Sequence, residues 1–212
     1  SEKYRIVGTL HLPQTPRPPV VIGSHGLYGT AESAKQVVLA DACVAAGMGY
    51  FRFDHRGCGR STGDFNRVTT LAGRLRDLTA AVDAVLKRED TADRYGLFGS
   101  SLGGTVSMAA FELRPPAALV LCAAPVRSGD IETSAGLNDT GAPPAARRPE
   151  GLSFDVTGKM ANLRDVLLFH GDADEVVPCR HADEIYAAAA EPKKLITLPG
   201  GDHRMTHPAH QK

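Results

Sequence analysis

The sequence lacks the features that would place this chain in a membrane or on a nucleic acid. No apolar run approaches the ~20 residues that a transmembrane helix needs, so no membrane span is expected. The 24 basic and 24 acidic residues give a formal net charge of zero. No basic block interleaved with aromatic side chains stands out, so we expect no nucleic-acid partner.

Cysteine is scarce, and its spacing argues against a disulfide framework or a metal site. The four cysteines are scattered at positions 43, 58, 122 and 179, and no two of them form a Cys-x-x-Cys pair. No stretch has metal-ligand spacing, and the glycines around Cys58 lack the lysine of a phosphate-binding loop. No signal peptide is recognisable. The simplest interpretation is a reduced, cytoplasmic protein without a metal.

The 212 residues have the length of one domain, and their predicted elements alternate in kind. Strands are expected at residues 4–12, 20–24, 50–54, 95–100, 117–123, 166–170 and 194–198. Helices are expected at residues 31–46, 69–88, 102–113 and 182–190. This alternation predicts one α/β domain over residues 1–212, with a mostly parallel, twisted sheet and helices on both faces.

A serine motif follows one of the predicted strands. Residues 99–103 read Gly-Ser-Ser-Leu-Gly, a Gly-x-Ser-x-Gly pattern centred on Ser101. A serine on a tight strand-to-helix turn is held in a strained conformation, and its neighbours two positions away must be small. Gly99 and Gly103 meet that requirement for Ser101, whereas the adjacent Ser100 lacks glycine at both offsets. Ser101 is therefore the candidate nucleophile.

Candidate partners for this serine follow later in the chain. A serine hydroxyl needs a base to take its proton and a carboxylate to orient that base. The apolar run 166–170 leads into a loop with Asp172 and Asp174, and the last predicted strand leads into His203. Both loops follow the carboxyl end of a predicted strand, where the ligand crevices of open α/β sheets form.

With these motifs, the chain resembles the α/β-hydrolase superfamily over nearly its whole length. His-Gly-x-x-Asp-x-x-Val-Pro at residues 170–178, Gly-Asp-His at 201–203 and Asp-x-Arg-Gly-x-Gly-x-Ser at 54–61 join the serine motif in the family order. The chain is most similar to small esterases and lipases with a Ser-His-Asp triad, including feruloyl- or cinnamoyl-type esterases and serine aminopeptidase-like hydrolases. The resemblance implies the α/β-hydrolase fold, cleavage of a small-molecule carboxylic ester through an acyl-enzyme, and no cofactor.

The resemblance also assigns the triad. It implies Ser101 as the nucleophile, Asp174 as the acid and His203 as the base. The family spacing favours Asp174 over its neighbour in the same loop. Two other histidines, His207 and His210, lie in the polar tail and compete with His203 for the role of the base.

The residues after the second predicted strand resemble the oxyanion turn of the family. Residues 25–29 read His-Gly-Leu-Tyr-Gly and match its His-Gly-x-x-Gly pattern. In relatives, the N–H after His-Gly pairs with the N–H after the nucleophile, which implies Leu27 and Leu102 as donors. Removing one such donor costs ~3–4 kcal/mol of transition-state stabilisation. His25 and Gly26 are expected to shape the turn.

Residues 125–162 interrupt the alternation of strands and helices. This stretch is rich in glycine, proline, alanine and charged residues, and in the resembled family a cap or lid is inserted at this place. It is too short and too polar for a helical cap with its own core, so we expect a short lid. The alternative is a surface insertion with no role in substrate binding.

Other functions stay open from the sequence. The same triad serves amidases, aminopeptidases and thioesterases, and an aminopeptidase needs an acidic site for the substrate amine. Asp130, Glu132 and Asp139 are candidates for that site. A non-catalytic binding protein of the same fold is less compatible with a complete triad.

The resemblance also implies a long helix after the base, but only nine residues follow His203. If that helix is truly absent, one face of the sheet would be exposed, and a homo-oligomer or an unstable protein is then expected.

Overall fold

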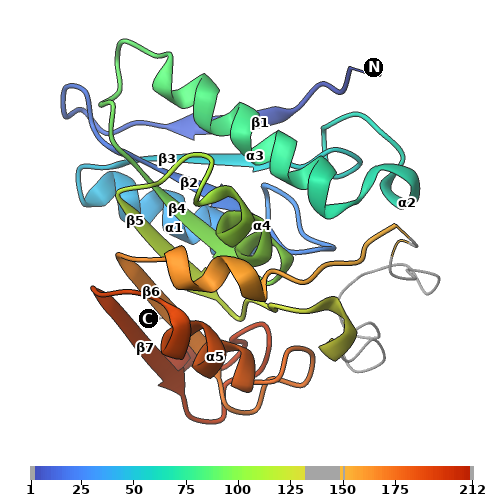
Figure 1. Cartoon of the computed structure of the whole chain (residues 1–212). Coiled ribbons are helices and arrows are strands. Elements are labelled where there is room, and N and C mark those ends of the chain that lie inside the picture. Colours follow the sequence, from blue (N-terminus) through green and yellow to red (C-terminus); the bar gives the residue numbers. More distant parts are fainter. Residues whose placement is uncertain (1–2, 132–148, 150, 211–212) are drawn as a thin grey trace.

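A seven-stranded sheet forms the centre of the structure, a computed structural model in which residues 3–131, 149 and 151–210 are described (Figure 1). The described strands follow the spatial order β1-β3-β2-β4-β5-β6-β7. Strand β1 is antiparallel to β3, and the other neighbours are parallel. The bounds are Val7–His11 (β1), Val20–Ser24 (β2), Gly49–Asp54 (β3), Tyr95–Ser100 (β4), Ala118–Cys122 (β5), Val166–Gly171 (β6) and Lys193–Leu198 (β7). The predicted mostly parallel sheet is confirmed.

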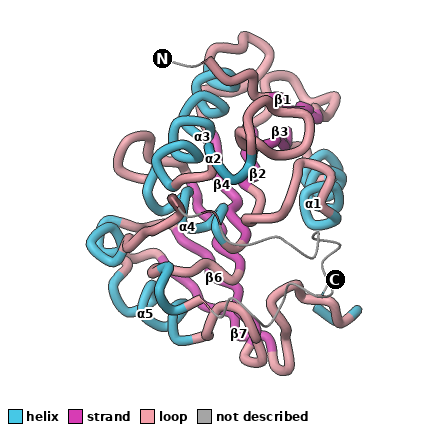
Figure 2. The backbone as a smooth tube through the Cα atoms, turned by 90° about the vertical axis from the view of Figure 1, so that its right-hand side faces the viewer, coloured by secondary structure: helices cyan, strands magenta, loops and turns pink. Residues whose placement is uncertain are grey.

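Helices cover both faces of this sheet, as the sequence predicts. Figure 2 shows α1 on one side and α3, α4 and α5 on the other. The bounds are Ala34–Ala45 (α1), Phe65–Val68 (α2), Leu71–Leu86 (α3), Leu102–Ala110 (α4) and Arg180–Ala188 (α5). Short 3-10 helices lie at Ser128–Asp130, Thr157–Asn162 and Pro208–His210. No helix in the described part of the chain has the length and apolar character needed to cross a membrane.

Some elements differ from the predicted ones for local reasons. Strand β1 begins at Val7 rather than at residue 4, because the N–H and carbonyl of Arg5 are both bonded to Thr62 in a loop. Helix α2 was not predicted, because four residues are too few to show a helical period. Asp64 caps this helix by accepting a backbone N–H through its carboxylate.

The main core lies between the sheet and helices α3 and α4. Ile22, Leu97 and Leu119, from three adjacent strands, are at most 1% exposed. Helix α3, which lies within the helix predicted for residues 69–88, packs here with Leu78 fully buried. This packing fixes α3 and α4, and the candidate nucleophile, Ser101, comes directly before α4.

The described ends of the segment 125–162 are part of this core. Val126 and Phe154 are buried in it, and the Val156 N–H donates to the Val126 carbonyl at 2.9 Å. Residues 132–148 and 150, the middle of the predicted lid, lie outside the described residues. The lid, and with it the division of the chain into a domain and an insertion, therefore remains a prediction.

Helix α4 begins against the end of β2 with no room for a side chain between them. A Cβ atom added at Gly103 would collide with the carbonyl oxygens of Ser24 and His25. Gly96 in β4 is different. A Cβ atom added there would lie 3.5 and 3.7 Å from its nearest neighbours, which is ordinary van der Waals contact. The close approach at Gly103 sets the start of α4 beside the residues that follow β2.

We predict that Gly103→Ala destabilises the fold and that Gly96→Ala does not. The methyl group at position 103 would push α4 away from β2, and overpacking of this kind costs about 1–3 kcal/mol. At position 96 the same change fits the native contacts and restricts the unfolded chain, so stability stays equal or rises slightly. Urea unfolding of both variants measures the difference, and equal free energies of unfolding would contradict the prediction.

Candidate active site

Ser101 lies on a strained turn between β4 and α4. Its backbone has φ 53° and ψ −126°, a left-handed conformation that residues other than glycine rarely adopt. Cβ atoms added at Gly99 or Gly103 would collide with neighbouring backbone atoms, so the turn needs both glycines. The Ser101 N–H donates to the Cys122 carbonyl at 2.8 Å, which ties the turn to the end of β5.

The loops after β6 and β7 meet at two glycines. A Cβ atom added at Gly171 would collide with the backbone of Gly201, and the Ala173 N–H donates to the Gly201 carbonyl at 3.1 Å. Asp174 lies on the first loop and His203 on the second. Because β6 and β7 are parallel neighbours, both loops emerge at the same edge of the sheet, and this contact brings the two side chains together.

Ser101, His203 and Asp174 form a continuous chain of hydrogen bonds. Ser101 Oγ is 3.1 Å from His203 Nε2, and His203 Nδ1 is 2.8 Å from Asp174 Oδ2. The Asp174 side chain is fully buried, while that of His203 is 14% exposed. In this arrangement Nε2 can accept the serine proton while the carboxylate holds the Nδ1–H. The structure thus brings together the three residues predicted from the sequence, and their catalytic roles remain a prediction.

The competing candidates have other surroundings. Asp172 Oδ1 accepts a backbone N–H from the loop after β7 at 2.6 Å. His207 and His210 lie against each other, with ring centroids 5.2 Å apart. Of the candidate acids and bases, Asp174 and His203 are the two that belong to the hydrogen-bond chain leading to Ser101.

The buried Asp174 carboxylate is surrounded by donors. Its Oδ1 accepts the N–H groups of Val176 and Val177 at 2.9 and 2.7 Å. His170 Nε2, which donates to the Val177 carbonyl, is 3.2 Å from Asp174 Oδ2. Burial alone would raise the pKa of this carboxyl, but hydrogen bonds from His170 and His203 hold its pKa well below the usual range. Asp174 is therefore ionised beside the imidazole.

Two residues that support the triad were not found from the sequence. His170 contacts the Asp174 carboxylate, as described above, and Glu175 Oε2 accepts the His203 N–H at 3.0 Å. The second bond fixes the backbone that bears the candidate base. A signal was present for His170, which is the first residue of the His-Gly-x-x-Asp-x-x-Val-Pro motif that supplies Asp174, but Glu175 occupies an unspecified position of that motif.

The turn at residues 25–29 lies against the nucleophile. A Cβ atom added at Gly26 would be 3.3 Å from the Ser101 Cβ. Within the described residues, neither the Leu27 N–H nor the Leu102 N–H donates to another group. Leu102 opens α4, where helix N–H groups have no intrahelical acceptor. Both groups are available to an oxyanion, and their role as its donors remains a prediction.

His25 shapes this turn through both ring nitrogens. Nδ1 bonds to the Gly26 carbonyl at 2.7 Å, and Nε2 accepts the His55 N–H at 3.1 Å. Burial, with the nearby Arg74 charge, holds the pKa of His25 well below its ordinary value. A neutral ring that donates from Nδ1 satisfies both contacts, so both nitrogens are used within the fold.

A buried charged network lies beside the turn. Arg56 donates through Nε and Nη2 to Asp77 Oδ1 at 2.9 and 2.7 Å. His55 lies beside the same carboxylate, and its Nε2 is 2.9 Å from Ser24 Oγ. Burial lowers the pKa of His55 to about 4, so the ring is neutral at neutral pH. Arg74 and Asp77 were missed from the sequence, although charges on the apolar face of a predicted helix were a visible signal.

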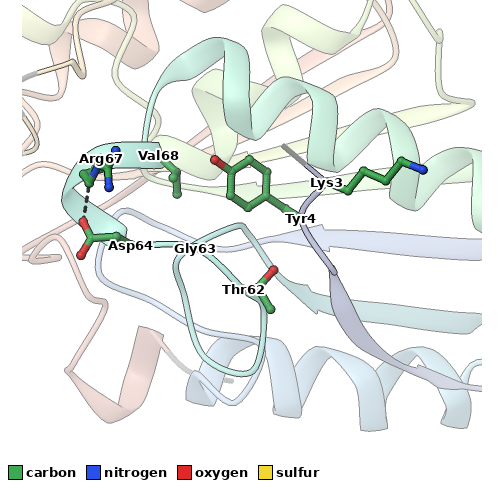
Figure 3. Close-up of a pocket in the computed structure, with 7 residues that line it drawn as sticks. All are labelled: Lys3, Tyr4, Thr62, Gly63, Asp64, Arg67 and Val68. Atoms are coloured by element: carbon green, nitrogen blue, oxygen red, sulfur yellow. Dashed lines mark hydrogen bonds between the residues drawn. The ribbon is translucent and has the colours of Figure 1, made fainter. Parts of the chain in front are cut away.

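A separate cavity of about 420 Å³ opens beside α2 (Figure 3). The Lys3 and Arg67 side chains lie on its walls with the ring of Tyr4, over which the Arg56 guanidinium packs at 4.7 Å. None of the triad residues lines it. Within the described ranges, no cluster of three or more His, Cys, Asp or Glu side chains could hold a metal ion.

Comparisons with known proteins identify relatives of this chain. YfhR, an uncharacterised protein of Escherichia coli K12, is 31% identical over 164 residues, which cover 72% of this chain and 52% of that protein. The chain therefore spans about half the length of this curated relative.

Solved structures share the fold. Est1E from Butyrivibrio proteoclasticus, solved with ferulic acid bound, superposes with a TM-score of 0.80 at 23% identity, covering 98% of this chain and 91% of that one. Mouse α/β hydrolase domain-containing protein 10 superposes with a TM-score of 0.75 at 22% identity, covering 99% and 90%. At these identities the likeness establishes the α/β-hydrolase fold.

A family model establishes the wider relationship. The model described as serine aminopeptidase, S33, matches residues 15–143, which is more than half of the 212 residues. That range contains both the turn after β2 and the strained serine turn after β4. The chain belongs to this serine aminopeptidase (S33) family of α/β hydrolases.

Proposed function

We propose that this α/β hydrolase is a serine esterase, which cleaves small carboxylic esters through an acyl-enzyme. The observation that carries the proposal is the hydrogen-bond chain from Ser101 Oγ through His203 to the ionised Asp174. A serine in a strained turn with an aligned imidazole and a buried carboxylate has the arrangement that nucleophilic acyl transfer requires.

The proposed reaction uses these groups in two halves. The Ser101 oxygen attacks the acyl carbon while His203 Nε2 takes its proton, and the Leu27 and Leu102 N–H groups bind the oxyanion. The imidazolium then protonates the leaving alkoxide, and the alcohol departs. In the second half His203 takes a proton from water as it attacks the acyl-enzyme, and returns that proton to Ser101. Asp174 holds the imidazole and stabilises its charge throughout.

The family name makes an aminopeptidase the second candidate. Such an enzyme needs a free carboxylate to bind the amine of its substrate. Of the three acidic residues proposed from the sequence, Asp130 is engaged by Arg127 at 2.9 Å and lies 3.6 Å from Arg180. The other two, Glu132 and Asp139, lie outside the described residues. The paired state of Asp130 favours the esterase over the aminopeptidase.

We expect Ser101→Ala to abolish ester hydrolysis, with kcat at least about 10⁴-fold lower, because the nucleophile is removed. The adjacent Ser100→Ala is the matched control and should retain activity. The assay uses p-nitrophenyl esters from acetate to laurate, with methyl ferulate added because a fold neighbour holds ferulic acid. Mass spectrometry after fluorophosphonate treatment should place the label on Ser101.

Substantial turnover by a folded Ser101→Ala preparation would refute the nucleophile assignment. Hydrolysis of aminoacyl-arylamides but not of esters, lost in the same variant, would favour the aminopeptidase instead.

We predict that Asp174→Asn lowers kcat by about 10³- to 10⁴-fold, because an amide neither fixes the productive tautomer nor stabilises the imidazolium. Asp172→Asn is the control, since its amide oxygen can still accept the backbone N–H that Asp172 binds. Its activity should stay close to that of the wild type. Steady-state kinetics of both variants distinguish the two acids, and a larger loss in Asp172→Asn would exchange their roles.

The pH profile of kcat/KM should show one ionisation on its acid side. The depressed pKa of Asp174 keeps the carboxylate ionised through and below the usual carboxyl range, so its contribution to stability is fully present above that range and is lost as the pH falls towards the depressed value. Asp174 therefore adds no step to the acid side of the profile in the working range, and that side reports a single base. Rates with a neutral ester from about pH 5 to 9 should give a logarithmic slope of one. A slope of two would mean that Asp174 titrates as well.

A further inference from the structure

Arg74 is a buried cation without an acidic partner. It is fully buried within α3, and it forms no ion pair with any carboxylate of the described residues, since the nearby Asp77 is paired with Arg56. A buried charge is unfavourable unless hydrogen bonds replace the water that it has lost. For Arg74 those bonds come from the turn at residues 25–29.

The guanidinium donates to three consecutive carbonyl groups of this turn. Nη1 donates to the oxygens of His25 and Gly26 at 3.2 and 3.1 Å, and Nη2 to the oxygen of Leu27 at 2.9 Å. Nη2 is also 3.5 Å from Cys58 Sγ. One rigid planar group thus fixes three successive peptide units.

The middle contact sets the direction of one N–H group. The Gly26 carbonyl and the Leu27 N–H belong to the same peptide unit, which is planar and trans, so they point in opposite directions. The Gly26 oxygen accepts from Arg74, from His25 Nδ1 at 2.7 Å and from the Gly29 N–H at 3.2 Å. With the carbonyl held on the Arg74 side, the Leu27 N–H faces away from the guanidinium.

We propose that Arg74 is a positioning residue for the oxyanion hole: by holding the Gly26 carbonyl, it keeps the Leu27 N–H turned toward the acyl oxygen. This inference rests on the proposed esterase function. A rotated peptide would present the Gly26 oxygen instead, and that oxygen would repel the developing oxyanion. The buried positive charge also polarises the peptide, which strengthens its N–H as a donor.

Two substitutions and one control test this role. Arg74→Met removes all the donors and keeps an unbranched stem, whereas Arg74→Lys keeps the charge and part of the donors. The control is Tyr95→Phe, which also removes a bond from a buried side chain to a carbonyl, that of Arg114. Tyr95 is the first residue of β4, at the opposite end of the strand from Ser101.

For Arg74→Met we expect kcat on p-nitrophenyl acetate to fall about 10- to 100-fold with KM nearly unchanged, because the oxyanion exists in the transition state and not in the bound ester. Affinity for an alkyl trifluoromethyl ketone, which forms a tetrahedral adduct with the serine, should fall by a similar factor. Arg74→Lys should recover part of both losses. The acid side of the pH profile should not move, since the triad is untouched.

The proposal is overturned if the kcat of both Arg74 variants equals that of Tyr95→Phe, if the loss lies in KM alone, or if the ketone binds every variant equally. Should urea unfolding show that Arg74→Met is not folded, Arg74→Lys decides: a reduced kcat with weaker ketone binding supports the proposal, and wild-type values overturn it.

A wild type that cleaves no ester and takes no fluorophosphonate overturns the proposed function and this inference together. If the wild type is active and both Arg74 variants keep its kcat and its affinity for the ketone, this inference alone is overturned.

Discussion

The geometry of the site depends on the left-handed backbone at Ser101. Such a conformation costs about 1–3 kcal/mol and persists only where the surroundings impose it. Strand β5 imposes it on one side through the bond from the Ser101 N–H to the Cys122 carbonyl. On the other side the start of α4 is pressed against the carbonyl of Ser24, where Gly103 leaves no gap. The second contact also brings the end of β2, and with it the turn at residues 25–29, beside the serine.

Fixed charges of opposite sign lie on the two sides of this serine. Arg74 contacts the turn at residues 25–29, whereas the carboxylates of Asp174 and Glu175 contact the ring and the backbone N–H of His203. In the proposed reaction negative charge develops on the acyl oxygen and positive charge on the imidazole. Each developing charge would meet an opposite charge that folding has already positioned, so little reorganisation is needed during the reaction.

The sequence predicted the parts of this site that are governed by short-range rules. Strand ends and the small residues around Ser101 follow from local sterics, whereas the assignment of Asp174 and His203 comes from the resemblance to α/β hydrolases. The structure brings these three side chains together. It did not reveal Arg74, because the three carbonyls that justify a buried guanidinium are far away in the sequence. Glu175 was not identified for a similar reason, because its hydrogen bond to the His203 N–H forms only when the ends of β6 and β7 lie side by side.

Three carboxylates accept backbone N–H groups of the loop that bears His203. Besides the bond to Glu175, Asp172 accepts the Gly200 N–H, and Asp202 accepts the Thr206 N–H at 2.8 Å. Met205 adds one apolar contact by packing into a small cluster with Phe98 and Cys122. Hydrogen bonds to a carboxylate are shorter and stronger than those between neutral groups. Two of these acceptors, Asp172 and Glu175, lie on the loop after β6 that carries Asp174, so the loop of the candidate acid positions the backbone of the loop that bears the candidate base.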